Sequence, residues 1–163
     1  TLDRSSAASD VYKRQAYDCV ETAPEPTGTG IGRIGRLETT VTFAEFAQRV
    51  ADALPETAWG IRAAGDPDKP ITTVAVASGS GGSFLPTAAA AGADVLVTSD
   101  LKHHIVDDHL AASDMCVIDT AHWASEFPWV YQAERAITSE LDVDTTIITL
   151  VTDPWNLGIR KEK

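Results

Sequence analysis

Apolar and polar positions change their spacing in a regular way along the second half of the chain. Four runs rich in β-branched or other apolar residues predict buried strands at 71–77, 93–98, 115–119 and 145–151. Helical spacing between and after these runs predicts helices at 84–91, 101–112 and 122–139. Strands that alternate with helices are typical of βαβ units, so we expect an α/β fold, a mixed or parallel sheet with flanking helices.

A further helix is predicted before these units, over residues 42–54. Thr42 suits the N-cap position, and Glu45 three residues later completes a capping box. Pro55 ends the helix, and a short strand is expected at 59–65. The glycines at 30, 32 and 35 spell G-x-G-x-x-G, but no buried strand leads into them and no helix follows at once. We therefore interpret them as structural.

The composition of the chain argues against two classes of binding partner, nucleic acids and membranes. The 163 residues carry 13 basic and 24 acidic side chains, a net charge of -11 that repels phosphate backbones, so we expect no nucleic-acid partner. No apolar run approaches the ~20 residues of a membrane span, and no signal sequence opens the chain, so we expect no membrane partner. The two cysteines, Cys19 and Cys116, fit a reducing compartment, and we expect a cytoplasmic protein.

Candidate chemistry gathers where the predicted strands end, because ligands bind beyond the carboxyl ends of parallel strands. His122 and Glu126 are four residues apart, one helical turn, directly after the strand at 115–119. An imidazole and a carboxylate in that position can grip a divalent cation. The alternative is an ordinary first helical turn with a favourably placed Glu and a surface His.

A second group follows the strand at 93–98. Asp100 and His104 are also four apart, and a carboxylate can orient a histidine and fix its tautomer. Adjacent residues of a helix point about 100° apart; we choose His104 over His103 and take Asp100 and His104 as catalytic candidates. The alternative is a solvated helix face. The loop at 78–83 is either a phosphate cradle or a tight turn.

The sequence offers fewer candidate metal ligands than a catalytic metal site usually has. Catalytic metal sites usually take three protein ligands, whereas this sequence offers His122 and Glu126, with His104 as a third candidate. Either the site is single and weak, or its remaining ligands lie on sequence that is not present here.

Three ordered segments, at 29–35, 92–104 and 119–126, resemble motifs of the NIF-three-like proteins, also called GTP cyclohydrolase 1 type 2 homologues. Residues 152–155 resemble the actinobacterial type of this family, and the resemblance extends from about residue 16 to residue 155. Ser99 and Ala121 stand where the family usually has glycine.

The resemblance implies the NIF-three-like fold and a homo-oligomer, a toroidal hexamer whose dinuclear centre holds two divalent metal ions, zinc, manganese or iron. His122 would ligate one metal, Glu126 would bridge both, and His104 would lie beside the centre. A metal-dependent hydrolase acting on a nucleotide-like substrate is the implied function. The alternative is a metal-binding hexameric assembly protein that is not an enzyme.

The resemblance also predicts how the chain is divided. Residues 16–28 would be the remnant strand of an inserted ferredoxin-like domain with a linker. Independently of the resemblance, residues 1–15 are small and polar with no period, so we expect a non-native leader there, and the alternative is a short disordered tail. Residues 29–155 would form the C-terminal half of the domain, and 156–163 a tail. The family's other ligands, a His-His pair and an acidic residue, belong to an N-terminal half that has no match here. We therefore expect an incomplete metal site and no activity from this chain alone.

Overall fold

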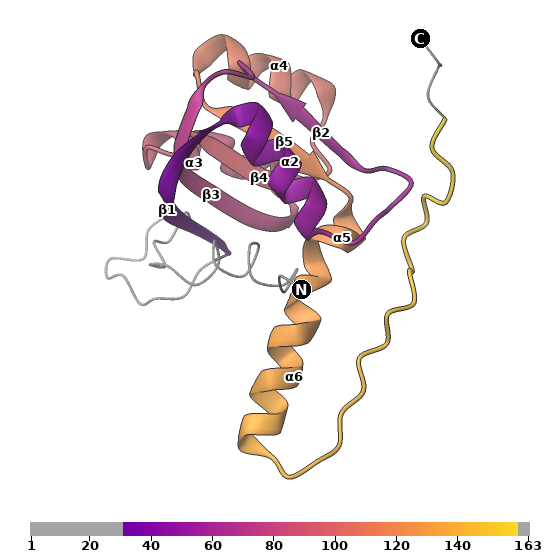
Figure 1. The fold of residues 1–163 in the computed structure, drawn as a ribbon. Coiled ribbons are helices and arrows are strands. Elements are labelled where there is room, and N and C mark those ends of the chain that lie inside the picture. The colour runs from indigo at the N-terminus through magenta and orange to yellow at the C-terminus, as the bar shows by residue number, and fades with distance from the viewer. Residues whose placement is uncertain (1–30, 160–163) are drawn as a thin grey trace.

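A five-stranded sheet in the order β1-β3-β4-β5-β2 organises residues 31–159, the part of the chain that this computed structural model describes (Figure 1). The strands are β1 (Gly32–Thr42), β2 (Ile61–Ala64), β3 (Pro70–Ser80), β4 (Val95–Ser99) and β5 (Cys116–Thr120). β3, β4 and β5 are parallel, and the edge strands β1 and β2 run antiparallel to their neighbours. The predicted α/β class and mixed sheet are confirmed. The predictions for residues 1–15, 16–28 and 160–163 lie outside the described residues.

Helices cover both faces of this sheet. They are α2 (Phe43–Ala53), the 3-10 turn η1 (Gly82–Phe84), α3 (Leu85–Ala90), α4 (His103–Ala112), α5 (His122–Glu126) and α6 (Pro128–Glu140). Phe43 and Phe46 of α2 pack on one face of the sheet, and Leu85 of α3 packs on the other. Cover on both faces explains why the central strands are apolar at successive positions. No helix within residues 31–159 has both the length and the apolar character needed to span a bilayer.

The parallel register of β4 and β5 fixes which residues meet at the carboxyl edge of the sheet. Ser99, the last residue of β4, pairs with Thr120, the last residue of β5. Their hydroxyl oxygens are 2.9 Å apart, and the Thr120 hydroxyl also donates to the Thr98 carbonyl at 3.2 Å. The two strands therefore end level with each other, and the residues that follow them emerge side by side.

The predicted strand at 145–151 does not form. Residues 141–159 are neither helix nor strand, and Ile148 and Leu150 are 75% and 71% exposed. In Figure 1 this segment starts at the far end of α6 and runs back alongside that helix as an extended chain. A strand needs a partner for its backbone groups, and within residues 31–159 no strand of the sheet pairs with this segment.

Two further predictions change in detail. The single helix expected at 122–139 is two helices, α5 and α6, because Pro128 has no N–H to donate to an earlier carbonyl and instead opens α6. Of the three glycines expected to be structural, Gly32 and Gly35 lie in the first half of the edge strand β1, and Gly30 lies outside the described residues. At residues 78–83 the chain makes a strand-to-helix turn, since Ser78 to Ser80 belong to β3 and η1 follows.

The capping box predicted at Thr42 is formed and gives a test of local stability. The Thr42 hydroxyl accepts the Glu45 N–H at 3.2 Å, and the Glu45 carboxylate accepts the Thr42 N–H at 3.0 Å. We expect Thr42→Ala to lower the free energy of unfolding, measured in urea, by about 1 kcal/mol. Thr39→Ala, an exposed threonine of β1, is the matched control. Equal losses in the two variants would contradict a capping role.

Candidate functional site

His122, the first residue of α5, lies between two carboxylates. Its Nδ1 is 2.5 Å from Asp100 Oδ2, and its Nε2 is 3.2 Å from Glu126 Oε1. Asp100 directly follows β4 and His122 follows β5 after one residue, so the level strand ends described above place them together. All three side chains are about half exposed, so the site is open to solvent.

The turn after β4 has an unusual backbone. Asp100 has a φ of 56° and is the one residue other than glycine within residues 31–159 with a positive φ. Aspartate tolerates this left-handed conformation better than most residues, because its short side chain can make local polar contacts. The next residue, Leu101, donates its N–H to Asp119 Oδ1 at 3.2 Å. Asp119 is buried in β5, so the turn is tied to the neighbouring strand.

Gly79 of β3 forms the third side of the site. Its φ is 66°, and its N–H donates to Ser125 Oγ at 3.2 Å, while that hydroxyl donates to the His122 carbonyl at 2.8 Å. A Cβ at this position would lie 3.1 Å from Glu126 Oε1 and 3.4 Å from His122 Nε2. Glycine therefore lets the backbone approach the His-Glu pair closely and leaves the space beside it open.

The hydrogen bond from Asp100 decides the electrostatics of His122. It raises the pKa of the imidazole above its usual value; burial opposes the shift, and the negative charges of Asp100 and Glu126 add to it. Both neighbouring carboxylates can only accept, and a neutral imidazole can donate to one of them. We assign the proton of the neutral ring to Nδ1 because its contact with Asp100, at 2.5 Å, is shorter than the 3.2 Å contact of Nε2 with Glu126. The lone pair of the neutral ring then lies on Nε2, facing Glu126.

This arrangement fits a cation shared by His122 and Glu126. Two ligands at about 2.0–2.2 Å from one tetrahedral metal ion lie about 3.3 Å from each other, close to the observed 3.2 Å between Nε2 and Oε1. The space that a Cβ of Gly79 would fill borders both atoms. Within residues 31–159, however, no group of three or more His, Cys, Asp or Glu side chains is arranged to hold a metal ion. Among the described residues, the side chains that border this space with atoms able to ligate a metal are those of His122 and Glu126.

His104 stands apart from this cluster. It is exposed near the start of α4, and neither a hydrogen bond nor an ion pair joins it to Asp100, His122 or Glu126 in the described part of the chain. Asp100, expected beside His104, instead contacts His122. The catalytic role expected of His104 stays a prediction.

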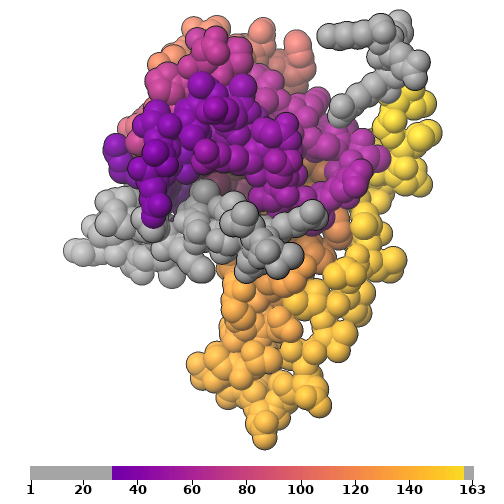
Figure 2. All heavy atoms as spheres, in the orientation of Figure 1, coloured from indigo at the N-terminus to yellow at the C-terminus, as the bar shows by residue number. Residues whose placement is uncertain are grey.

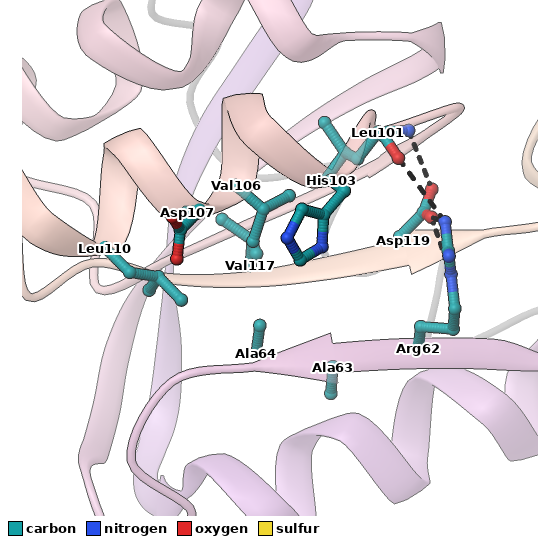
Figure 3. Close-up of a pocket in the computed structure, with 10 residues that line it drawn as sticks. All are labelled: Arg62, Ala63, Ala64, Leu101, His103, Val106, Asp107, Leu110, Val117 and Asp119. Atoms are coloured by element: carbon teal, nitrogen blue, oxygen red, sulfur yellow. Dashed lines mark hydrogen bonds and ion pairs between the residues drawn. The ribbon is translucent and has the colours of Figure 1, made fainter.

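Gly79, Arg62 and the contact between Asp100 and His122 are features of the site that were not predicted from the sequence. His103, the histidine not chosen, lines a separate pocket of about 300 Å³ together with Arg62 and Asp119 (Figure 3). The contact between Asp100 and His122 had a signal in the sequence, because both residues follow adjacent parallel strands. Gly79 and Arg62 had no comparable signal.

Comparison with known proteins places this site in a family. The model of the family described as Duf34/NIF3 (NGG1p interacting factor 3) matches residues 6–154. The chain belongs to the Duf34/NIF3 family. A Mycobacterium tuberculosis member named GTP cyclohydrolase 1 type 2 homolog is 47% identical over 152 residues, which cover 92% of this chain and 40% of that protein. A Streptomyces coelicolor member of the same name is 41% identical over 142 residues, covering 83% of this chain and 50% of its own length.

A solved structure confirms the NIF-three-like fold. The crystal structure of a Bacillus cereus protein related to NIF3 has a TM-score of 0.64 and 28% identity, and the match covers 76% of this chain and 35% of that one. The chain therefore spans less than half the length of this Duf34/NIF3 structure, and 40% of the mycobacterial relative.

The Asp100 hydrogen bond predicts how His122 titrates. We expect Asp100→Asn to lower the pKa of His122 toward its usual value of about 6.5, followed by NMR of the imidazole resonances. Because the folded-state pKa is raised, the contact stabilises the fold below the unfolded-state pKa, and this stabilisation is lost as the pH rises through the folded-state pKa. Asp108→Asn, an exposed carboxylate of α4, is the control. An unchanged His122 pKa in Asp100→Asn would contradict the assignment.

Proposed function

We propose that this chain supplies part of the dinuclear metal centre of a metal-dependent hydrolase acting on a nucleotide-like substrate. The observation that carries the proposal is the pair of metal-ligating atoms, His122 Nε2 and Glu126 Oε1, 3.2 Å apart beside the open face of Gly79. His122 would ligate one divalent ion, and Glu126 has a second oxygen with which to reach another. Zinc, manganese and iron all accept imidazole and carboxylate ligands.

The surroundings of the pair suit this role. A carboxylate that accepts the Nδ1 proton of a metal-ligating histidine fixes its orientation and raises its basicity, which is the contact that Asp100 makes with His122. The net charge of -11 favours cations near the surface. A bound divalent metal would polarise a phosphoryl or carbonyl oxygen and acidify a water molecule. The name of the relatives, GTP cyclohydrolase 1 type 2 homolog, supports a nucleotide-like substrate.

A second candidate function is a metal-binding assembly protein without turnover, built as a homo-oligomer such as a hexamer. The observation that favours it is a set of exposed apolar side chains along α6 and just beyond it. Trp129, Ile137 and Leu141 are 68%, 43% and 58% exposed, and they fall at multiples of four residues along the helix direction. Figure 2 shows α6 and the segment after it extending beyond the body of the protein. Exposed apolar patches of this kind mark protein interfaces.

Metal titration tests the ligand assignment directly. We expect the chain to bind Zn²⁺ or Mn²⁺ weakly in calorimetry at pH 7.5, and His122→Ala to weaken binding by at least tenfold. Binding should also weaken as the pH falls, because a proton on His122 competes with the metal. His104→Ala is the matched control, since His104 is exposed and does not contact the cluster. Equal affinity in His122→Ala and the unchanged chain would remove His122 from the ligand set.

Turnover and molar mass separate the two candidate functions. We expect the full-length mycobacterial relative, loaded with Mn²⁺ or Zn²⁺, to hydrolyse at least one member of a nucleotide panel. Glutamine at the position aligned with Glu126 should abolish that turnover, and glutamine at the position aligned with the exposed Glu140 should leave it unchanged. No turnover with any nucleotide, together with a metal-dependent oligomer in light scattering, would favour the assembly protein instead.

A further inference from the structure

We propose that Arg62 is a positioning residue for the metal-ligating imidazole of His122, although the two side chains make no contact. The inference rests on the proposed function in one respect only, that His122 is a ligand. Arg62 lies on the edge strand β2, and it acts through Asp119 and Leu101 on the turn that carries Asp100.

The Arg62 guanidinium is held on three sides. Its Nε and Nη2 both donate to Asp119 Oδ2, the Nε bond being 3.0 Å long, and Nη2 also donates to the Leu101 carbonyl at 3.4 Å. The guanidinium carbon lies 4.6 Å from the centroid of the Trp59 ring, within the range of a cation–π contact. Figure 3 shows the arginine side chain rising from β2 toward the Asp119 carboxylate and Leu101. One side chain thus joins the edge strand, β5 and the turn after β4.

Leu101 is fixed through both of its backbone groups. Its N–H donates to Asp119 Oδ1 at 3.2 Å, and its carbonyl accepts from Arg62, while Arg62 and Asp119 form an ion pair with each other. These contacts close a ring that holds the two peptide groups on either side of the Leu101 Cα. The Leu101 side chain is also buried, with 6% exposure, so the residue can shift neither along the sheet nor outward.

Fixing Leu101 fixes Asp100, its neighbour in the chain. Asp100 has a φ of 56°, a conformation that costs free energy for any residue with a side chain and persists when the surroundings enforce it. In this conformation its Oδ2 lies 2.5 Å from His122 Nδ1. A displaced Leu101 would release the turn and lose the contact that selects the Nδ1–H tautomer. Arg62 therefore determines, through Leu101 and Asp100, which nitrogen of His122 is available to a metal.

An arginine is required for this arrangement. The planar guanidinium presents several donors in one rigid fork, whereas the ammonium group of lysine is a single point charge. Lysine at position 62 would neutralise Asp119, which is 4% exposed, but it would not hold the Asp119 carboxylate and the Leu101 carbonyl in the same fixed geometry. If Arg62 only neutralised Asp119, lysine would replace it fully.

The tautomer of His122 tests the inference in the metal-free chain. Long-range ¹H–¹⁵N correlation spectra at a pH where the ring is neutral distinguish Nδ1–H from Nε2–H. We expect the Nδ1–H tautomer to predominate in the unchanged chain and to become the minor form in both Arg62→Met and Arg62→Lys. Arg49→Met, an exposed arginine of α2, is the matched control and should keep the Nδ1–H form. Arg62→Lys decides the outcome if Arg62→Met does not fold.

Two results would overturn the inference. One is that His122 keeps the Nδ1–H tautomer in Arg62 variants that fold but have a lower free energy of unfolding. In that case Arg62 would only stabilise the fold and would not position His122. The other is a predominant Nε2–H tautomer in the unchanged chain. Failure of the unchanged chain to bind Zn²⁺ would instead count against the proposed function, since the tautomer comparison needs no metal. Where Zn²⁺ binds, we expect Arg62→Lys to weaken it by tenfold or more.

Discussion

The level ends of β4 and β5 are the constraint on which the candidate site depends. Parallel pairing of Ser99 with Thr120 brings the next residues of both strands to the same height at the sheet edge. Asp100 and His122 then meet across the gap between strands, although 22 residues separate them in the sequence. A slip of the register by one residue would turn every side chain of the strand to the opposite face and would separate the two groups. The apolar cover on both faces of β4 and β5 opposes such a slip.

The three neighbours of His122 at this sheet edge have different effects on its imidazole ring. Asp100 accepts the proton on one nitrogen, Glu126 faces the other nitrogen, and Gly79 keeps the intervening space free of a side chain. The cluster carries two carboxylates around one imidazole, an excess of negative charge that a cation would balance. A half-exposed cluster of this kind is open to further ligands from outside residues 31–159.

The sequence correctly predicted the elements that depend only on residues close together in the chain. The capping box at Thr42 and the apolar runs of β3, β4 and β5 needed no knowledge of distant residues. The His122–Glu126 pair was also recognisable, because both residues lie on one turn of one helix. The strand expected at 145–151 failed for the opposite reason: the run is rich in β-branched and apolar residues, but a strand also needs a partner edge, which the composition of the run does not reveal. The sequence indicated that Asp100 and His122 each follow a strand of the same sheet edge, but their direct contact also requires those two strands to be neighbours. The contact of Arg62 with Asp119 likewise depends on the pairing of β2 with β5, which spacing alone does not specify.

The proposed site requires one arrangement of atoms above all, a metal ion on the Nε2 side of His122 with Asp100 on the Nδ1 side. Anomalous diffraction from crystals of the chain grown with Zn²⁺ tests this directly. We expect an anomalous peak about 2.0–2.2 Å from both His122 Nε2 and Glu126 Oε1, with the Asp100 carboxylate still hydrogen-bonded to Nδ1. A peak bonded to His122 Nδ1, or zinc bound only at other residues while the His122–Glu126 pair remains vacant, would contradict it.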